Sequence, residues 1–271
     1  MRAAPATGAG QDGVLRLSFG RRGRGTVLVN RYASAPFGAV RASHPDDSGI
    51  PEVQITNPSG GILGGDRLEV EVDVSPGASA TVLTQAANKA YRGEEASQAG
   101  VLRVGDGGLL EYLPHHLIPY AGSDYRQETV FQLVPDATLL AWDAFAAGRV
   151  ARGERFAFSR LRGRTTIFRD GIPEAIDGFD LAGASEPFGG YSYVAGAHVL
   201  APDDLGPLAE ELHLSLACVP GTLASASAPA PGLCVVRILA DRAPELYRAL
   251  NGVRCLVRKS LGLPAPAREV D

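Results

Sequence analysis

Residues 57–67, Asn-Pro-Ser-Gly-Gly-Ile-Leu-Gly-Gly-Asp-Arg, form the first stretch whose residue types and spacing could do chemistry. The glycine pairs 60–61 and 64–65 permit positive φ angles or a close approach to another surface. A count from Gly60 gives the spacing of a phosphate-binding Walker A loop, but Asp66 and Arg67 stand where that loop needs Lys and Ser or Thr. Because a carboxylate at this place repels phosphate, the sequence argues against a nucleoside triphosphatase.

A second polar stretch combines an amide, an ammonium, a phenol and a guanidinium within eight residues: Gln85, Lys89, Tyr91 and Arg92. Tyr and Arg are enriched among the residues that anchor protein interfaces, which favours a contact with a partner. The alternative is that Lys89 and Arg92 only solvate a loop while Tyr91 packs. Arg149 has a similar pair of interpretations, either as a buried hydrogen-bond donor that holds strand ends together or as a contact residue.

Histidines and cysteines give no pattern of a closed metal site, which normally needs three or four ligands. His115 and His116 are adjacent, so in a strand their side chains point to opposite faces, whereas in a loop after Pro114 they could share one side. The cysteines lack Cys-x-x-Cys spacing and are expected to pack in the core as small apolar residues: Cys218, Cys234 and Cys255.

Carboxylates are the remaining candidates for catalysis. Two that face each other in a pocket could act as general acid and base, so a hydrolase with paired carboxylates on a β scaffold is one hypothesis. The sequence places no two of them within catalytic distance, and it has no Gly-x-Ser-x-Gly elbow and no dinucleotide fingerprint. The carboxylates considered are Asp66, Glu111, Asp143, Glu154, Asp170, Glu174, Asp177 and Asp180.

The composition indicates a globular chain with a sizeable core, since 45% of the 271 residues are hydrophobic and 21% are charged. A net charge of −4 argues against nucleic acid as a partner. No apolar run approaches the roughly 20 residues that span a bilayer, and the odd number of cysteines fits a reducing compartment. We therefore expect a cytoplasmic protein without a membrane partner: a flexible tail over residues 1–12 and a single β-rich domain over residues 13–271.

Three turn sequences recur along the first half of the chain, at residues 75–78, 105–108 and 134–137. Each separates two strand-like runs, as hairpin chemistry predicts. The expected fold is mostly β: a layered, β-helical-like stack of antiparallel hairpins with one or two helices. A C-terminal helix is expected near 242–261, capped by Asp241. The expected hairpin strands are 68–74 with 78–84, 101–104 with 109–113, and 129–134 with 138–142; further strands are expected at 155–161, 164–169, 193–200, 211–219 and 233–240, and a loop at 222–230.

After each turn the returning strand enters a polar segment that bears aromatic residues: 85–92, 114–120 and 142–152. If the strand pairs stack in register, these three segments gather at one end of the sheet. We expect that edge to be the working surface.

Taken in order, these motifs resemble the urease accessory protein UreD family, also called UreH. The resemblance rests on Asn57-Pro through Gly64-Gly-Asp66-Arg67, on Gln85-Ala-x-x-Lys89-x-Tyr91-Arg92, on Glu111-Tyr-Leu-Pro114 with Ile118-Pro-Tyr120, and on Gly148-Arg149 with Gly153-Glu154. It covers residues 20–260 in order and is strongest over 52–160. Members of the family often end in Trp-containing segments, whereas here residues 263–271 read Leu-Pro-Ala-Pro-Ala-Arg-Glu-Val-Asp.

The resemblance implies a urease maturation factor without catalytic chemistry of its own. Its implied partners are a helical UreF-type accessory protein, a UreG-type GTPase and apo-urease, which receives nickel as GTP is hydrolysed. It implies no tightly bound cofactor, only nickel in transit. The residues that carry the family signature are Asp66, Arg67, Gln85, Lys89, Tyr91, Arg92, Tyr120 and Arg149. Residues of suitable type to touch a passing ion are Asp66, Glu111, His115, His116 and Asp143. A carbohydrate-binding module is a weaker alternative, because Trp142 is the only tryptophan for an aromatic platform.

Overall fold

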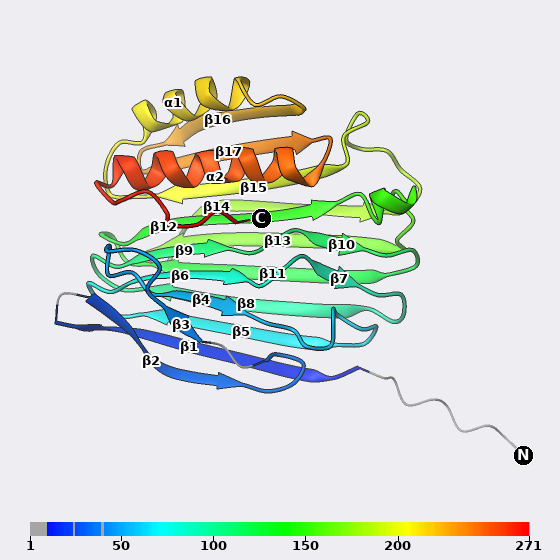
Figure 1. Ribbon diagram of the computed structural model, residues 1–271, viewed down its shortest axis with the longest axis horizontal. Coiled ribbons are helices and arrows are strands. Elements are labelled where there is room, and N and C mark those ends of the chain that lie inside the picture. The colour runs from blue at the N-terminus through cyan, green and yellow to red at the C-terminus, as the bar shows by residue number, and fades with distance from the viewer. Residues whose placement is uncertain (1–9, 24, 39–40, 271) are drawn as a thin grey trace, which may run out of the picture.

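Two β-sheets lie face to face in the computed structural model, which describes residues 10–23, 25–38 and 41–270 (Figure 1). Within these residues the first sheet has the strand order β14-β13-β11-β8-β5-β1-β2 and the second β16-β17-β15-β12-β9-β6-β4-β3, with β10 beside β12 and β7 beside β10. The first sheet comprises β1 (Asp12–Arg22), β2 (Gly25–Ala33), β5 (Arg67–Val74), β8 (Ala96–Val104), β11 (Asp124–Leu133), β13 (Arg160–Arg169) and β14 (Ile172–Ala182). The second comprises β3 (Ala42–Ser43), β4 (Glu52–Ile55), β6 (Ser79–Thr84), β7 (Asn88–Ala90), β9 (Leu109–Leu113), β10 (Leu117–Pro119), β12 (Thr138–Ala146), β15 (Tyr193–Leu200), β16 (Thr222–Ala230) and β17 (Leu233–Ala240).

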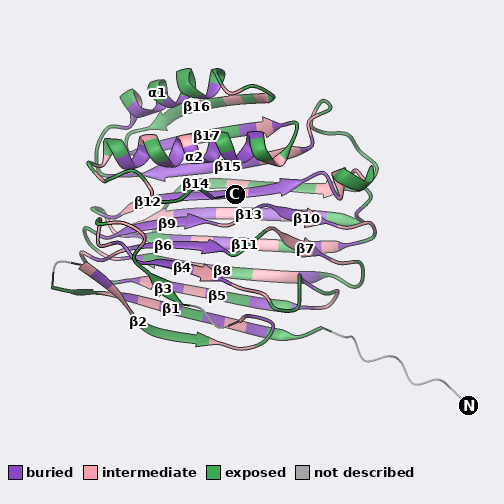
Figure 2. Cartoon of the chain, in the orientation of Figure 1, coloured by how far each residue is buried: buried purple, intermediate pink, exposed green. Residues whose placement is uncertain are grey.

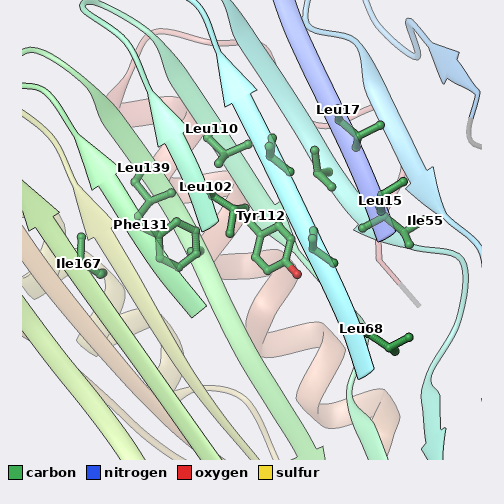
Figure 3. Close-up of a cluster of buried hydrophobic side chains, with 14 of the residues drawn as sticks. Leu15, Leu17, Ile55, Leu68, Leu102, Leu110, Tyr112, Phe131, Leu139 and Ile167 are labelled. Atoms are coloured by element: carbon green, nitrogen blue, oxygen red, sulfur yellow. The ribbon is translucent and has the colours of Figure 1, made fainter. Parts of the chain in front are cut away.

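The middle of the chain winds between the two sheets as a flattened coil. In the first sheet β5, β8, β11 and β13 stack in parallel, and in the second β4, β6, β9 and β12 do the same. Alternation explains the layering: in β5 the side chains of Leu68, Val70 and Val72 are buried whereas Glu69 is exposed, so one face of the strand must pack on a second layer. Figure 3 shows the resulting cluster of apolar side chains between the sheets. The expected mostly β, layered fold is confirmed.

The predicted pairing of consecutive strands as antiparallel hairpins is wrong. Residues 75–78 join β5 in one sheet to β6 in the other, and the other two turns do the same. The turns stack on one another as corners, since the backbone N–H of Gly77 donates to the carbonyl of Asp106 at 2.7 Å and that of Thr138 to the carbonyl of Gly108 at 2.8 Å. A Pro-Gly turn reverses the chain equally well within one sheet or between two, so the sequence could not separate these outcomes.

Two helices cover the outer face of the second sheet: α1 (Gly206–Ala217) and α2 (Ala243–Ser260) (Figure 1). Figure 2 shows buried residues along the inner side of both helices and exposed residues along the outer side. The expected C-terminal helix near 242–261 is therefore confirmed as α2. Its predicted cap is wrong, because Arg242 occupies the N-cap position and no side chain caps the helix.

Several expected elements take another form. Residues 211–219 belong mostly to α1: Leu212, Leu214 and Leu216 alternate as in a strand, yet Leu214 is 62% exposed while Leu208, Leu212 and Leu216 follow a helical spacing. Residues 222–230 form strand β16 rather than a loop, because backbone pairing with β17 offsets the low strand propensity of their small residues. Most of 155–161 precedes β13. The strands expected at 193–200 and 233–240 match β15 and β17, and 164–169 lies within β13.

Of the predicted tail, residues 1–9 lie outside the described residues, and β1 begins at Asp12. Among the cysteines only Cys234 is buried, so the expectation of core packing is wrong for Cys218 and Cys255. No helix in the described part of the chain is long and apolar enough to cross a membrane. The short helix η1 (Val150–Arg152) links β12 to β13.

Candidate functional site

The three polar segments do gather at one end of the second sheet, where β7 and β10 lie, and we call this end the edge. Strand β10 pairs in parallel with β7, which aligns Ile118 with Lys89, and it also pairs with β12. On the other side of β7 a bridge joins Ile62 to Ala90, which brings the glycine-rich loop alongside. The predicted gathering therefore holds although the hairpins do not, because successive coils in parallel register place equivalent segments beside one another.

The glycine-rich loop is built for close packing against residues 89–94. A side chain at Gly61 would lie 2.5 Å from the carbonyl oxygen of Lys89, and one at Gly64 would lie 2.6 Å from the Cα of Gly93. Asp66 closes the loop: one carboxylate oxygen accepts the N–H of Gln11 and the other that of Leu63, both at 2.8 Å. Asp66 is 1% exposed, so its place among the signature residues has a structural explanation.

Aromatic and charged signature residues form a column across this edge. The rings of Tyr91 and Tyr120 meet edge to face with centroids 4.9 Å apart. The guanidinium of Arg149 lies 4.5 Å from the centre of the Tyr120 ring, a cation–π geometry. Arg149 also donates to Glu154, and this hydrogen bond lowers the pKa of Glu154 and raises that of Arg149. Arg149 is thus part of a half-buried cluster that ties three successive coils together.

The other signature residues of this edge are accessible. Gln85 and Arg92 are exposed and Lys89 is half-buried, while the Arg67 side chain is 79% exposed beside Asp12. Gln85 and Lys89 also line an interior cavity of about 140 Å³ that opens between the sheets near the glycine-rich loop. The edge therefore joins an exposed polar surface to the interior of the protein.

Three cavities adjoin one another as a row, because neighbouring cavities share lining residues. The central cavity, of about 140 Å³, shares Tyr112, Gln127 and Asp143 with a cavity of about 190 Å³ between the sheets. On its other side it shares His115 with a wider cavity of about 720 Å³ under α2. Asp143 and His115 thus stand at the two junctions of the row.

Asp143, on β12, lies between the two sheets. Burial raises the pKa of its carboxyl to about 6, the nearby charge of Asp177 adds to this, and hydrogen bonds from the Ala144 backbone and the Gln127 side chain act in the opposite direction. This carboxylate is ionised near pH 7, and its hydrogen bonds only partly offset its negative charge. Such a group can attract a cation without enclosing it.

The far end of the row carries a bridge between the sheets. Asp177 of β14 pairs with Arg237 of β17 at 2.9 Å and lies 3.5 Å from Nε2 of His198 on β15. Burial lowers the pKa of His198 to about 4, with Asp177 raising it and Arg237 lowering it. His198 is therefore neutral near pH 7 and can offer a lone pair.

At the α2 end the adjacent histidines lie in a loop, and both rings pack against Tyr247 of α2. The Nδ1 atom of His116 is 2.7 Å from the Tyr247 hydroxyl, and that of His115 is 3.1 Å from Oγ1 of Thr84. Burial lowers the pKa of His116 to about 4, and the neighbouring His115 contributes. These contacts leave His116 neutral and fixed in orientation.

Glu111, the last of the transit candidates, is fully engaged elsewhere. Its carboxylate accepts hydrogen bonds from Arg258 at 2.6 Å, from Arg254 at 2.8 Å and from Thr81 at 2.7 Å. Burial by itself would raise the pKa of Glu111, but the hydrogen bond from Arg258 and the charges of both arginines lower it. Glu111 anchors α2 to the second sheet.

The described residues hold no preformed metal centre, and the two carboxylates that share an interior cavity are not both free of an ion pair. No group of three or more His, Cys, Asp or Glu side chains there is arranged to hold an ion. Asp143 and Asp177 line one cavity, but Asp177 is paired with Arg237. Residues that the sequence did not single out are Gln127, Arg237, Tyr247, Arg254 and Arg258. The sequence contains a partial signal for Arg254 and Arg258, because two arginines four residues apart lie on one side of α2, next to its apolar stripe.

The fold and the site together define a class of protein: a layered β scaffold with one polar, aromatic edge and a row of interior cavities. The chain matches the model of the UreD urease accessory protein family over residues 11–271 and belongs to that family. It is 32% identical to urease accessory protein UreD of Delftia acidovorans, over 96% of this chain and 93% of that protein. Similar relatives are UreD of Haloarcula marismortui, 34% identical over 95% and 90% of the two chains, and UreD 2 of Streptomyces griseus, 36% identical over 94% and 92%.

Proposed function

We propose that this chain is a urease maturation factor. It acts as a scaffold that joins a UreF-type accessory protein and a UreG-type GTPase to apo-urease, and nickel reaches the urease site as the partner hydrolyses GTP. The chain supplies no nucleotide site of its own, in keeping with Asp66 and Arg67 at the positions where a Walker A loop needs Lys and Ser or Thr.

The row of cavities supports an interior route for the ion. A passing cation needs ligands that it can leave, and the row offers them singly: the carboxylate of Asp143, and the neutral imidazoles of His116 and His198. Nickel binds deprotonated ligands, so the lowered pKa values of both histidines suit it. This arrangement of separate donors is the observation that carries the proposal.

Exposed apolar side chains support the role of a scaffold. They lie on edge strands and on the outer helix: Val29 and Tyr32 on β2, Ile172 and Ile176 on β14, Leu214 on α1 and Leu223 on β16. An edge strand with exposed apolar side chains presents unpaired backbone groups and apolar surface that a partner protein can cover.

Assembly tests this proposal. We expect the isolated chain to have a low soluble yield and the yield to rise on co-expression with the UreF-type protein, because binding covers apolar surface. Size-exclusion chromatography of the accessory proteins with apo-urease should give one complex when this chain is present and separate components when it is omitted. Equal soluble yield with and without the partner, or a complete complex without this chain, would contradict the role of a scaffold.

A hydrolase with paired carboxylates remains a second candidate, because Asp143 and Asp177 share a cavity. The ion pair of Asp177 with Arg237 disfavours it, since a general acid or base must exchange a proton freely. Asp143→Leu separates these candidates, because it would abolish the activity of a hydrolase but lower the nickel content of urease if this chain is a maturation factor.

A further inference from the structure

Residues 263–270 leave the end of α2 and turn back across the outer face of the second sheet (Figure 1). They have no regular secondary structure, yet their last described residue, Val270, is 2% exposed. We call residues 263–270 the strap. An irregular segment that ends in a buried side chain needs specific contacts to hold it, and the strap makes three kinds.

Asn251 of α2 holds the backbone of the strap. Its side-chain amide donates to the carbonyl of Val270 at 2.8 Å, and its side-chain oxygen accepts the N–H of Val270 at 2.9 Å. Both bonds go to main-chain atoms, so Asn251 binds any residue that presents its backbone here. Asn251 is 6% exposed, and loss of the strap would leave a buried amide without these two partners, which is costly.

Glu52 of β4 holds the basic residue of the strap. This carboxylate is 2% exposed and accepts a hydrogen bond from Nε of Arg268 at 2.7 Å, together with a second bond from the same guanidinium. Arg254 lies farther away, at 3.9 Å from Glu52, and is engaged with Glu111. Without Arg268 the buried charge of Glu52 keeps only this distant partner, so the position selects a cation.

The third contact is apolar and lies over the outermost cavity. Val270 packs into the hydrophobic cluster of α2, and together with Glu269 it lines the cavity of about 720 Å³ that also contains His115 and His116. A backbone clamp, a buried carboxylate and an apolar slot in one groove are the features by which proteins recognise short peptides.

We propose that this groove is a peptide-binding site which the strap occupies as an intramolecular ligand, and that a partner segment takes its place. The partner segment carries an arginine or lysine two residues before a branched aliphatic residue, the pattern of Arg268 and Val270. Its docking would move the strap away from the histidine cavity. The inference rests on the proposed function only in taking the partner to be a member of the maturation assembly.

A labelled peptide with the strap sequence, Leu-Pro-Ala-Pro-Ala-Arg-Glu-Val, tests the site by fluorescence anisotropy. The full chain with Val270→Asp has a weakened strap and an intact groove, and it should bind the peptide saturably. The unsubstituted chain should bind at least about tenfold more weakly, because a tethered ligand competes at an effective concentration in the millimolar range. Ala267→Ser is the matched control, since Ala267 is an exposed residue of the strap that does not line the cavity; it should behave as the unsubstituted chain.

Two further changes test the chemistry of the groove. Adding Asn251→Leu to the Val270→Asp chain should lower peptide affinity at least about tenfold, as should a peptide with Glu in place of its Arg. No saturable binding to the Val270→Asp chain, or equal binding by the unsubstituted chain, would overturn the proposal. So would equal binding of the charge-reversed peptide. A concentration-dependent dimer of the unsubstituted chain that Val270→Asp abolishes would assign the groove to a second copy instead. No urease or nickel is present, so these results are independent of the maturation assay.

Discussion

Asp143→Leu is expected to lower the nickel content and the activity of co-expressed urease roughly ten- to hundredfold. The variant removes one charge-assisted contact to the passing cation, and such a contact contributes about 1.5–3 kcal/mol. Asp143 stands where two of the interior cavities meet, and leucine replaces its carboxylate by an apolar group of similar size. The complex with the accessory proteins and apo-urease should still form, because Asp143 lies between the sheets. Nickel per active site, measured in purified urease, checks this result.

The same variant should be more stable than the unsubstituted protein near neutral pH. Burial raises the pKa of Asp143 from an ordinary 3.8 to about 6, so the folded state binds this proton more tightly than the unfolded state does. The free energy of unfolding therefore falls as the pH rises from about 4 to 6, by up to about 3 kcal/mol. This loss of stability persists above about pH 6. Asp143→Leu and Asp143→Asn should both remove this slope in urea unfolding between pH 4 and 8.

Asp106→Asn, at an exposed turn, is the control for loss of one carboxylate. It should change neither the nickel content of urease nor the pH dependence of unfolding. A Leu variant that is stable and still delivers full nickel would exclude Asp143 from the route. A hydrolase would behave differently, because Asp143→Leu would abolish hydrolysis by the isolated chain while urease remained fully loaded.

Glu111→Leu is expected to have the largest effect on stability, a loss of about 3–5 kcal/mol, because it leaves Arg254 and Arg258 as buried charges without their shared partner. Urea unfolding at pH 7 measures this loss. The control is Asp180→Asn, which breaks the exposed pair with Arg160 and should leave the unfolding midpoint almost unchanged.

The pH dependence of the Glu111 contribution has the opposite sign to that of Asp143. The two arginines hold the pKa of Glu111 below its ordinary value of 4.5. Its contribution is therefore present above about pH 4.5 and is lost as the pH falls through the lowered pKa of the folded state. Glu111→Leu should lack this acid-sensitive part of the unfolding curve. A variant as stable as the unsubstituted protein at pH 7 would show that Glu111 does not anchor α2.

The layered β fold could be predicted because alternation in residues 68–74 requires one buried face, whatever the direction of the neighbouring strand. The same alternation is compatible with parallel and antiparallel partners, so it could not show that residues 75–78 cross between sheets. The strand assigned to 211–219 failed for a related reason. Leu212, Leu214 and Leu216 alternate as in a strand, but Leu208, Leu212 and Leu216 also fit one face of a helix, and packing of that face on the second sheet decided for α1.

The site was predictable only where residues are close in sequence. The glycine-rich loop and residues 85–92 stand out by composition, and register then brings them together. The bridge of Asp177, His198 and Arg237 joins three strands from both sheets, and the contact of Arg149 with Tyr120 depends on β10 lying beside β12. No local pattern carries such information, because these contacts arise from long-range strand order.

The most direct measurement is the nickel content and activity of urease co-expressed with its accessory set, with and without this chain. We expect omission to remove both nickel and activity, and expression of the chain from a second plasmid to restore both. Urease that is fully loaded with nickel in the absence of this chain would contradict a role in maturation.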